Sequence, residues 1–172
     1  MAHSILASAL RRLPSGVNVI TAGRAPNRSG YTGTAFFSLS FEPQRVIISV
    51  NRNSSAFPVI RDAEAFAVNL LSTDQQDIAE RFAGKHGAKG EERYAGAVWR
   101  TGELGVSLLD GAVTNIECRI EEIIERHSHA LIIGEVFSVA VDQTREALVY
   151  HDSRYGAVTS PAAVSSSALA AE

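Results

Sequence analysis

The sequence is poor in the residues that build disulfides and metal sites. Its single cysteine, Cys118, cannot form an intrachain disulfide, and this composition fits a reducing cytosol. The five histidines are scattered, and neither a C-x-x-C nor an H-E-x-x-H motif occurs. We therefore expect no metal site, because the recognised metal motifs hold their ligands at close, regular spacing.

Long apolar runs and a strong charge of one sign are also lacking. No apolar stretch reaches the ~18 residues that span a bilayer, and the N-terminus has no long apolar signal core. The net charge of −3 gives no reason to expect binding to nucleic acid or to an anionic membrane. We expect a cytoplasmic protein with neither partner.

Two patterns that would indicate other folds are absent as well. No segment recurs with a period of about 20 to 50 residues, so a solenoid is not expected. A G-x-G-x-x-G motif and the β-α-β alternation of a Rossmann sheet are both missing. Many strand patterns with few, short helices instead predict a mainly β fold, a closed antiparallel barrel.

The expected helices cover residues 3–13, 54–61 and 72–82. Ser54 or Ser55 would cap the second helix, and a capping box, for which the spacing occurs at both Ser72 and Thr73, would begin the third. The 172 residues suffice for one domain with its own core, which we place at residues 1–160. The Ala- and Ser-rich tail, residues 161–172, has little to bury and should be flexible unless a partner subunit holds it.

Two strands are expected in the central stretch, one on each side of Glu42-Pro43, and the second contains residues 46–50. The other expected strands are residues 16–22, 65–71, 114–124, 130–141 and 147–151. Apolar and polar residues alternate over 114–124, which is typical of a half-buried antiparallel strand. Residues 130–141 are apolar nearly throughout, so we expect both faces of that strand to be covered. The charged segment 85–93 should be mobile, and residues 94–110 should be partly irregular.

The stretch from Gly30 to Ser55 carries the most informative pattern. It begins with small and hydroxylated residues, continues into the β-branched strand 46–50, and ends in a polar run. Small residues let a flat ligand approach the backbone closely, and the polar run suits a phosphate. From composition alone, a strand edge with solvated hydroxyl groups is the more ordinary interpretation.

This stretch resembles the short-chain flavin reductases of the FMN-binding split-barrel superfamily, the small reductase components of two-component monooxygenases. Their pattern is roughly G-x-T-A/G-x-x-F-x-S-L/V-S-x-x-P, a strand, then V-N/D-R-x-S-S. The chain matches it closely, although Asn53 stands where the family often has Ser. The resemblance covers roughly residues 10–156 and implies a split β-barrel with a few peripheral helices.

The resemblance assigns the first part of the stretch to the flavin ring. Backbone N–H groups of an extended segment can bind the ring edge, and donors near N1 and O2 stabilise the anionic reduced flavin. The residues concerned are Thr32, Thr34, Ala35, Ser38, Leu39 and Ser40.

The resemblance assigns the polar run to the flavin phosphate and ribityl chain. The residues concerned are Asn51, Arg52, Ser54 and Ser55. Arg52 supplies a fixed charge, and the two serines stand where a helix is expected to begin. An ordinary helix cap beside a solvated arginine is the alternative.

Three further matches lie outside this stretch. In E-R-F-A-G the resemblance places Phe82, Ala83 and Gly84 near the flavin, although a helical aromatic is usually a core residue. His129 matches a family histidine on the nicotinamide side of the ring, where a structural histidine is the alternative. Tyr155 lies in Arg154-Tyr155-Gly156, which is similar to a family R-x-Y-G near the C-terminus that would help to fold the hydride donor over the ring.

The resemblance implies an NAD(P)H-dependent flavin reductase. Hydride would pass from nicotinamide C4 of NADH or NADPH to N5 of FMN or FAD, and reduced flavin would leave for a separate oxygenase. Two alternatives remain: reduction of another acceptor, such as a corrinoid or a ferric complex, and a flavin-binding module without turnover. The implied assembly is a homodimer, because a strand that is apolar on both faces needs more cover than one chain offers.

Overall fold

The structure is a computed structural model that describes residues 2–158, without the side chains of residues 2–4 and 86. The strands are β1 (Ser15–Gly16), β2 (Asn18–Arg24), β3 (Asn27–Gly33), β4 (Phe36–Phe41), β5 (Gln44–Asn51), β6 (Ala65–Leu70), β7 (Trp99–Thr101), β8 (Ser107–Leu109), β9 (Thr114–Arg126), β10 (His129–Val141), β11 (Leu148–His151) and β12 (Arg154–Ala157). The helices are α1 (Ala2–Leu10), α2 (Phe57–Arg61) and α3 (Gln76–Phe82), and the 3-10 helices are η1 (Thr73–Gln75), η2 (Lys85–Gly87) and η3 (Gly90–Tyr94). The predicted tail, residues 161–172, lies outside the described residues.

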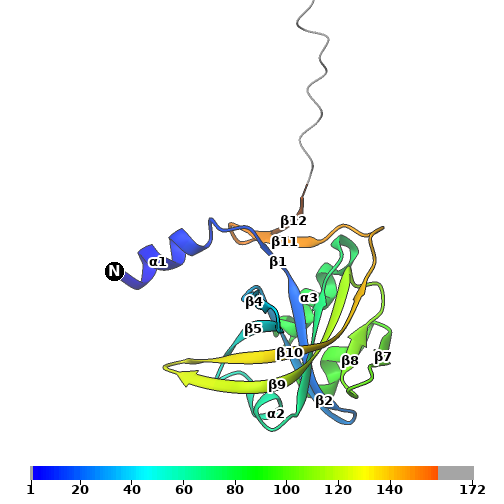
Figure 1. The fold of residues 1–172 in the computed structure, drawn as a ribbon. Helices are drawn as coiled ribbons and strands as arrows, with labels where there is room; N and C mark the ends of the chain where they lie inside the picture. Colours follow the sequence, from blue (N-terminus) through cyan, green and yellow to red (C-terminus); the bar gives the residue numbers. More distant parts are fainter. Residues whose placement is uncertain (1, 159–172) are drawn as a thin grey trace, which may run out of the picture.

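Seven strands form one curved sheet in the order β3-β2-β6-β9-β10-β5-β4 (Figure 1). Every neighbouring pair in it is antiparallel, and the long hairpin of β9 and β10 crosses its centre. A smaller sheet, β1-β11-β12, lies over one end, and the β7–β8 hairpin packs on β2 and β6. The prediction of a mainly β, antiparallel fold with few helices is confirmed.

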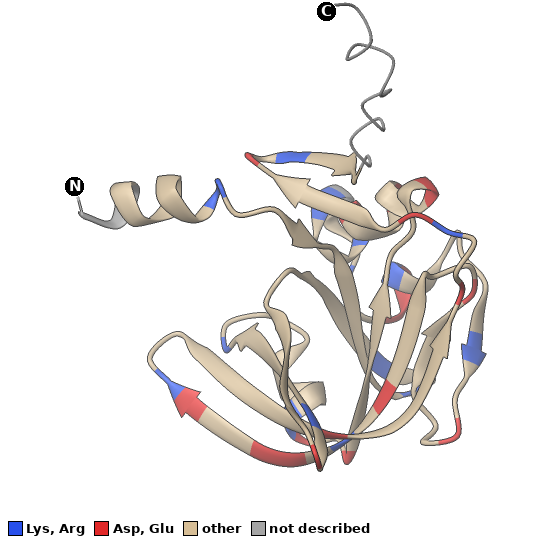
Figure 2. Cartoon of the chain, turned by 45° about the horizontal axis from the view of Figure 1, so that its top comes forward, with Lys and Arg blue, Asp and Glu red and all other residues tan. Residues whose placement is uncertain are grey.

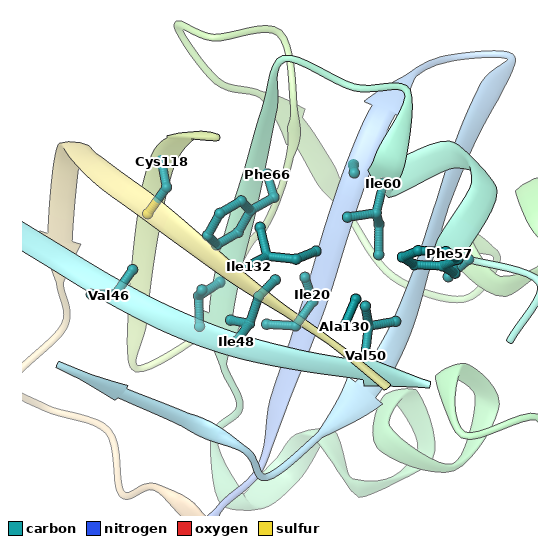
Figure 3. Close-up of a cluster of buried hydrophobic side chains, with 13 residues drawn as sticks. Ile20, Val46, Ile48, Val50, Phe57, Ile60, Phe66, Cys118, Ala130 and Ile132 are labelled. Carbon is teal, nitrogen blue, oxygen red and sulfur yellow. The ribbon is translucent and has the colours of Figure 1, made fainter. Parts of the chain in front are cut away.

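The main hydrophobic core fills the inside of the curved sheet and is closed by α2 (Figure 3). Phe66, Ile48 and Ile132 are fully buried there. Burying side chains of this size stabilises the fold by about 1.5–3 kcal/mol each. A Cβ on Gly134 would lie 2.6 Å from the Phe66 ring, so the glycine in β10 makes room for this packing.

A second core joins α3 to the β3 side of the sheet and to the small sheet. Its centre is a cluster of three rings, in which Phe82 lies 5.1 Å from Tyr94 and 5.5 Å from Trp99 between centroids. Within residues 85–93, which we expected to be mobile, the chain forms η2 and begins η3, and Tyr94 at the end of η3 packs in this cluster. Arg93 is buried there and donates from Nη1 to the carbonyl of Gly30 at 2.5 Å. Within the segment expected to be irregular, β7 and β8 pair with each other.

The expected beginning of α2 is wrong. The helix begins at Phe57, and its N-cap is Ala56, which makes no side-chain capping hydrogen bond. Burial of Phe57 and Ile60 against the sheet sets where the helix begins, so Ser54 and Ser55 lie in the preceding turn. The capping box at Ser72 is confirmed, although it begins η1, which leads directly into α3.

The two longest strands differ from expectation in opposite ways. On β9 the polar residues Asn115 and Glu117 are buried, because the segment before β8 covers them. The Glu117 carboxylate accepts hydrogen bonds from the backbone N–H groups of Glu103 at 3.2 Å and Leu104 at 2.9 Å. On β10 the outward side chains of Phe137 and Val139 are 42% and 55% exposed, so one chain leaves that face open.

The N-terminal helix projects away from the sheets (Figure 1). It ends at Leu10, three residues earlier than expected, and its large apolar side chains are exposed by more than half. Positive and negative side chains are interspersed over the rest of the fold (Figure 2). Within residues 2–158, no helix has the length and apolarity needed to cross a bilayer.

Candidate functional site

A cavity of about 540 Å³ opens where the end of β3, the end of α3 and the β11–β12 hairpin meet. Four of the predicted site residues line it, together with residues that sequence reasoning missed. The predicted ones are Thr32, Thr34, Ala83 and Tyr155; the missed ones that matter below are Gln76, Glu80, Lys85 and Tyr150.

Strand β3 reaches the cavity because it packs tightly on α3. Gly30 allows this approach, since a Cβ there would lie 2.4 Å from the Ile20 carbonyl oxygen and 2.8 Å from the Phe82 ring. Two residues later, the Thr32 hydroxyl donates a hydrogen bond to the Ala79 carbonyl at 2.6 Å. The end of β3 is therefore held at a fixed place on the cavity wall.

The opposite wall is aromatic. Tyr150 and Tyr155 face each other across the β11–β12 hairpin, with ring centroids 5.1 Å apart and planes at 62°. Burial raises the pKa of Tyr155, so its hydroxyl stays protonated and can donate a hydrogen bond at neutral pH. Tyr150 was missed because its place opposite Tyr155 depends on the pairing register of the hairpin, which the sequence pattern does not give.

A charged group completes the lining. The chain leaves α3 through Gly84, whose φ of +84° is favourable only for glycine, and Lys85 follows. The Lys85 ammonium lies 2.9 Å from a carboxylate oxygen of Glu80, which raises the pKa of Lys85 further above its usual range. The same oxygen accepts a hydrogen bond from the Gln76 amide at 3.2 Å.

Phe82 does not present its ring to the cavity. It is 1% exposed and belongs to the second core, so the placement of Phe82 near the flavin stays a prediction that does not involve an exposed ring. Its neighbour Ala83 lines the cavity, and Gly84 has open space where a Cβ would be.

The residues of β4 form an exposed strip next to the cavity end of β3. Ala35 follows Thr34 and accepts a hydrogen bond from the backbone N–H of Ser49 at 3.2 Å, which ties the strip to β5. Ser38 and Leu39 are exposed on this edge strand, and the Ser40 hydroxyl donates to the Pro43 carbonyl. The strip therefore lies exposed at the edge of the main sheet.

The polar run after β5 lies beside His129, the first residue of β10, which pairs with Asn51. Arg52 is already engaged there: its guanidinium lies 2.5 Å from the Glu125 carboxylate and donates to the His127 carbonyl at 3.0 Å. The Ser54 hydroxyl is buried and has no hydrogen-bond partner among the described residues.

The histidine and the polar run lie outside the cavity lining. The imidazole Nδ1 of His129 lies 2.9 Å from the Ser128 hydroxyl, and the side chain is exposed. The structure thus brings together two separate groups of predicted residues: one in the cavity, and one where β5 ends and β10 begins. Among residues 2–158, no three His, Cys, Asp or Glu side chains are grouped so as to hold a metal ion.

Comparison with known proteins identifies the family. The family model for the flavin reductase like domain matches residues 10–159. The FMN reductase (NADH) RutF of Stutzerimonas stutzeri is 36% identical over 152 residues, which cover 88% of this chain and 86% of the relative. The actinorhodin polyketide dimerase of Streptomyces coelicolor is 35% identical over 169 residues, 96% of this chain and 92% of the relative.

Solved structures agree with this result. The NADH:FAD oxidoreductase SgcE6 of Streptomyces globisporus superposes with a TM-score of 0.85 at 28% identity, covering 92% of this chain and 94% of that chain. The same oxidoreductase in complex with NAD and FAD fragments superposes with a TM-score of 0.84. These neighbours confirm the predicted split barrel. The chain belongs to the flavin reductase-like family.

Proposed function

We propose that this protein is an NADH-dependent flavin reductase that supplies reduced flavin to a separate oxygenase. The observation that carries the proposal is the cavity between β3 and the β11–β12 hairpin, which has a backbone wall of small residues facing an aromatic pair. Relatives named FMN reductase (NADH) and NADH:FAD oxidoreductase support the choice of NADH as donor. FMN is the favoured flavin, with FAD as the alternative.

The described residues fit a flavin at two points. Thr32, Gly33 and Thr34 offer exposed strand backbone at the cavity wall, where a ring edge needs donors and acceptors. The buried Ser54 hydroxyl, which lacks a partner among the described residues, suits a phosphate oxygen. A bound flavin supplies the hydride-accepting N5 atom, and the chain supplies positioning and polar contacts.

The roles of the remaining site residues follow from their places. Ala83 and Gly84 leave room beside the ring, and Tyr155 orients the donor from the opposite wall. His129 holds a part of the donor that extends beyond the cavity, and it acts through orientation rather than proton transfer. Asn51, Arg52 and Ser55 surround the proposed phosphate position, although Glu125 already neutralises much of the Arg52 charge.

A homodimer is part of the proposal. Three apolar surfaces are exposed in the single chain: on α1, on the edge strand β4, and on the outer face of β10. Helix α1 carries no charged residue and projects from the body (Figure 2), and Phe37, Leu39 and Phe41 point outward from β4 with 50–79% exposure. Apolar surfaces of this kind mark protein–protein contacts. The partner oxygenase would dock on a surface that the second copy leaves free.

The direct test is NADH oxidation by the purified full-length chain, with and without added FMN or FAD. The proposal predicts acceleration well above the rate with free flavin, and a lower rate when NADPH replaces NADH. A flavin-binding module would bind FMN without acceleration. The assay should also include a corrinoid and a ferric complex as acceptors. Reduction of such an acceptor without release of reduced flavin would favour the alternative enzyme.

A further inference from the structure

The chain contains two lysines, and they occupy different surroundings. Lys85 lines the cavity, where its ammonium lies 2.9 Å from Glu80 and 5.9 Å from the centroid of the Tyr155 ring. Lys89 is exposed on the segment between η2 and η3 and does not line the cavity. The cavity therefore holds a cation whose partner is a carboxylate of its own chain.

The contact between Lys85 and Glu80 is one that an incoming anion can replace. The Lys85 side chain is 56% exposed, whereas the Glu80 side chain is 23% exposed. Exposed ion pairs contribute little to stability, so opening this one costs the fold little. When the ammonium leaves, Glu80 keeps its hydrogen bond from the Gln76 amide. Lys85 has a long, flexible side chain, so it is the residue of the ion pair that moves.

The other cavity groups indicate which anion this is. Arg154 is exposed on the same cavity wall and makes no described hydrogen bond or ion pair. The aromatic pair of Tyr150 and Tyr155 lines the same cavity, and the Lys85 ammonium lies beside the Tyr155 ring. Two cations and two aromatic rings in one cavity suit a phosphate ester joined to a flat ring, which is the chemistry of a nucleotide.

We propose that Lys85 binds a phosphate of the hydride-donating dinucleotide, and that Glu80 holds Lys85 in the cavity and is exchanged for that phosphate when the donor binds. This inference rests on the proposed function, because it takes the cavity to be the donor site. The flavin phosphate is a different source of the same chemistry, but its proposed place is the polar run around Ser54, outside the cavity. Glu80 is therefore a positioning residue that acts through Lys85.

The test measures binding without turnover. ADP-ribose, which has the donor's pyrophosphate but no nicotinamide, is titrated into the full-length protein by calorimetry. Lys85→Met should weaken its binding roughly three- to tenfold, as expected for an exposed charge-assisted contact. Glu80→Gln should strengthen it by a similar factor, because the competing carboxylate is gone. Lys89→Met is the matched control and should leave binding unchanged.

The double variant Glu80→Gln/Lys85→Met separates exchange from simple repulsion. Exchange predicts that it binds ADP-ribose as weakly as Lys85→Met alone. A gain from Glu80→Gln that persists without Lys85 would overturn the exchange, because Glu80 would then be acting on the phosphate directly. Unchanged binding in Lys85→Met would overturn the phosphate contact.

A parallel titration with FMN distinguishes the two sources of phosphate. FMN affinity should be the same in Lys85→Met and in the unsubstituted protein, and weaker FMN binding with unchanged ADP-ribose binding would overturn the assignment to the donor. Equal unfolding temperatures of the variants would exclude a loss of fold as the cause. NADH oxidation by the unsubstituted protein tests the proposed reductase function separately. The exchange at Lys85 can therefore fail while the reductase function holds, and the two failures are distinguishable.

Discussion

The hydroxyl of Thr32 donates a hydrogen bond to the carbonyl of Ala79 at 2.6 Å, and this contact joins the end of β3 to α3 at the cavity wall. The same carbonyl also accepts the backbone N–H of Ala83, the C-cap of α3, at 2.9 Å, so β3 and the end of α3 meet at one oxygen atom. The position of the backbone at the cavity wall thus depends on a hydrogen bond made by the Thr32 side chain.

Replacing Thr32 by Val should loosen this wall. The substitution keeps the shape of the side chain but removes the donor, and the Ala79 carbonyl keeps its bond from Ala83. We expect a loss of about 0.5–1.5 kcal/mol in the free energy of unfolding and weaker FMN binding. Urea unfolding and an FMN titration check both, and Thr32→Ser, which restores the hydroxyl, should recover them. Full FMN affinity in Thr32→Val would contradict a role for this strand end.

Replacing Ser54 by Ala should weaken FMN binding without destabilising the protein. The hydroxyl is buried and has no partner among the described residues, so its removal breaks no described contact. Loss of a hydrogen bond to the flavin phosphate would weaken binding roughly three- to tenfold. The neighbouring variant Asn53→Ala is the control and should bind FMN normally. Unchanged affinity in Ser54→Ala would place the phosphate elsewhere.

The stability of the η3 segment should depend on pH through Glu91. Its carboxylate accepts hydrogen bonds from the Arg28 guanidinium, which packs on the Tyr94 ring, and these bonds lower the pKa of Glu91. A lowered pKa in the folded state stabilises the fold above the ordinary carboxyl pKa, and that contribution is lost as the pH falls through the folded-state value.

Glu91→Gln should therefore be less stable than the unsubstituted protein at pH 7, by no more than about 1 kcal/mol because the carboxylate is half exposed. The difference should shrink as the pH falls below about 4.5 and disappear when Glu91 is protonated in the folded protein. Urea unfolding across this range measures it. A difference that stays constant with pH would show that the ion pair is not its cause.

His129→Ala should raise the KM for NADH while leaving FMN affinity nearly intact. The imidazole is exposed at the beginning of β10 and is in contact with the Ser128 hydroxyl. Loss of one hydrogen bond to the donor corresponds to roughly a three- to tenfold increase. If His129 only closes the turn, the variant will instead unfold at a lower temperature and have normal kinetics. Lost FMN binding with normal hydride transfer would refute the assignment to the donor.

The parts of the fold that local sequence determines were predictable. The capping box at Ser72 and the glycine after α3 act through residues within one helical turn, and both are present as expected. The beginning of α2 was not predictable in this way, because burial of Phe57 against distant strands decided it. Glu117 is buried for a similar reason: backbone donors of Glu103 and Leu104, far from it along the chain, satisfy its carboxylate.

The candidate site was predictable only in part. Four residues that the motifs named, Thr32, Thr34, Ala83 and Tyr155, line one cavity in the structure, and their contact with flavin or donor stays a prediction. The motif also named Phe82 but did not show that its ring is buried in the second core, because that packing depends on Tyr94 and Trp99, which lie later in the chain. Lys85 and Tyr150 carry no motif, and only the folding of α3 against the hairpin brings them to the cavity.

The most direct test of the central claim is anaerobic reduction of FMN by NADH, followed by loss of flavin absorbance in a stopped-flow instrument. With the full-length protein, FMN should be reduced much faster than by NADH alone, and Tyr155→Ala should lower that rate while the protein still binds FMN. A rate equal to that of the uncatalysed reaction, with FMN bound, would contradict the account and leave a flavin-binding protein without reductase activity.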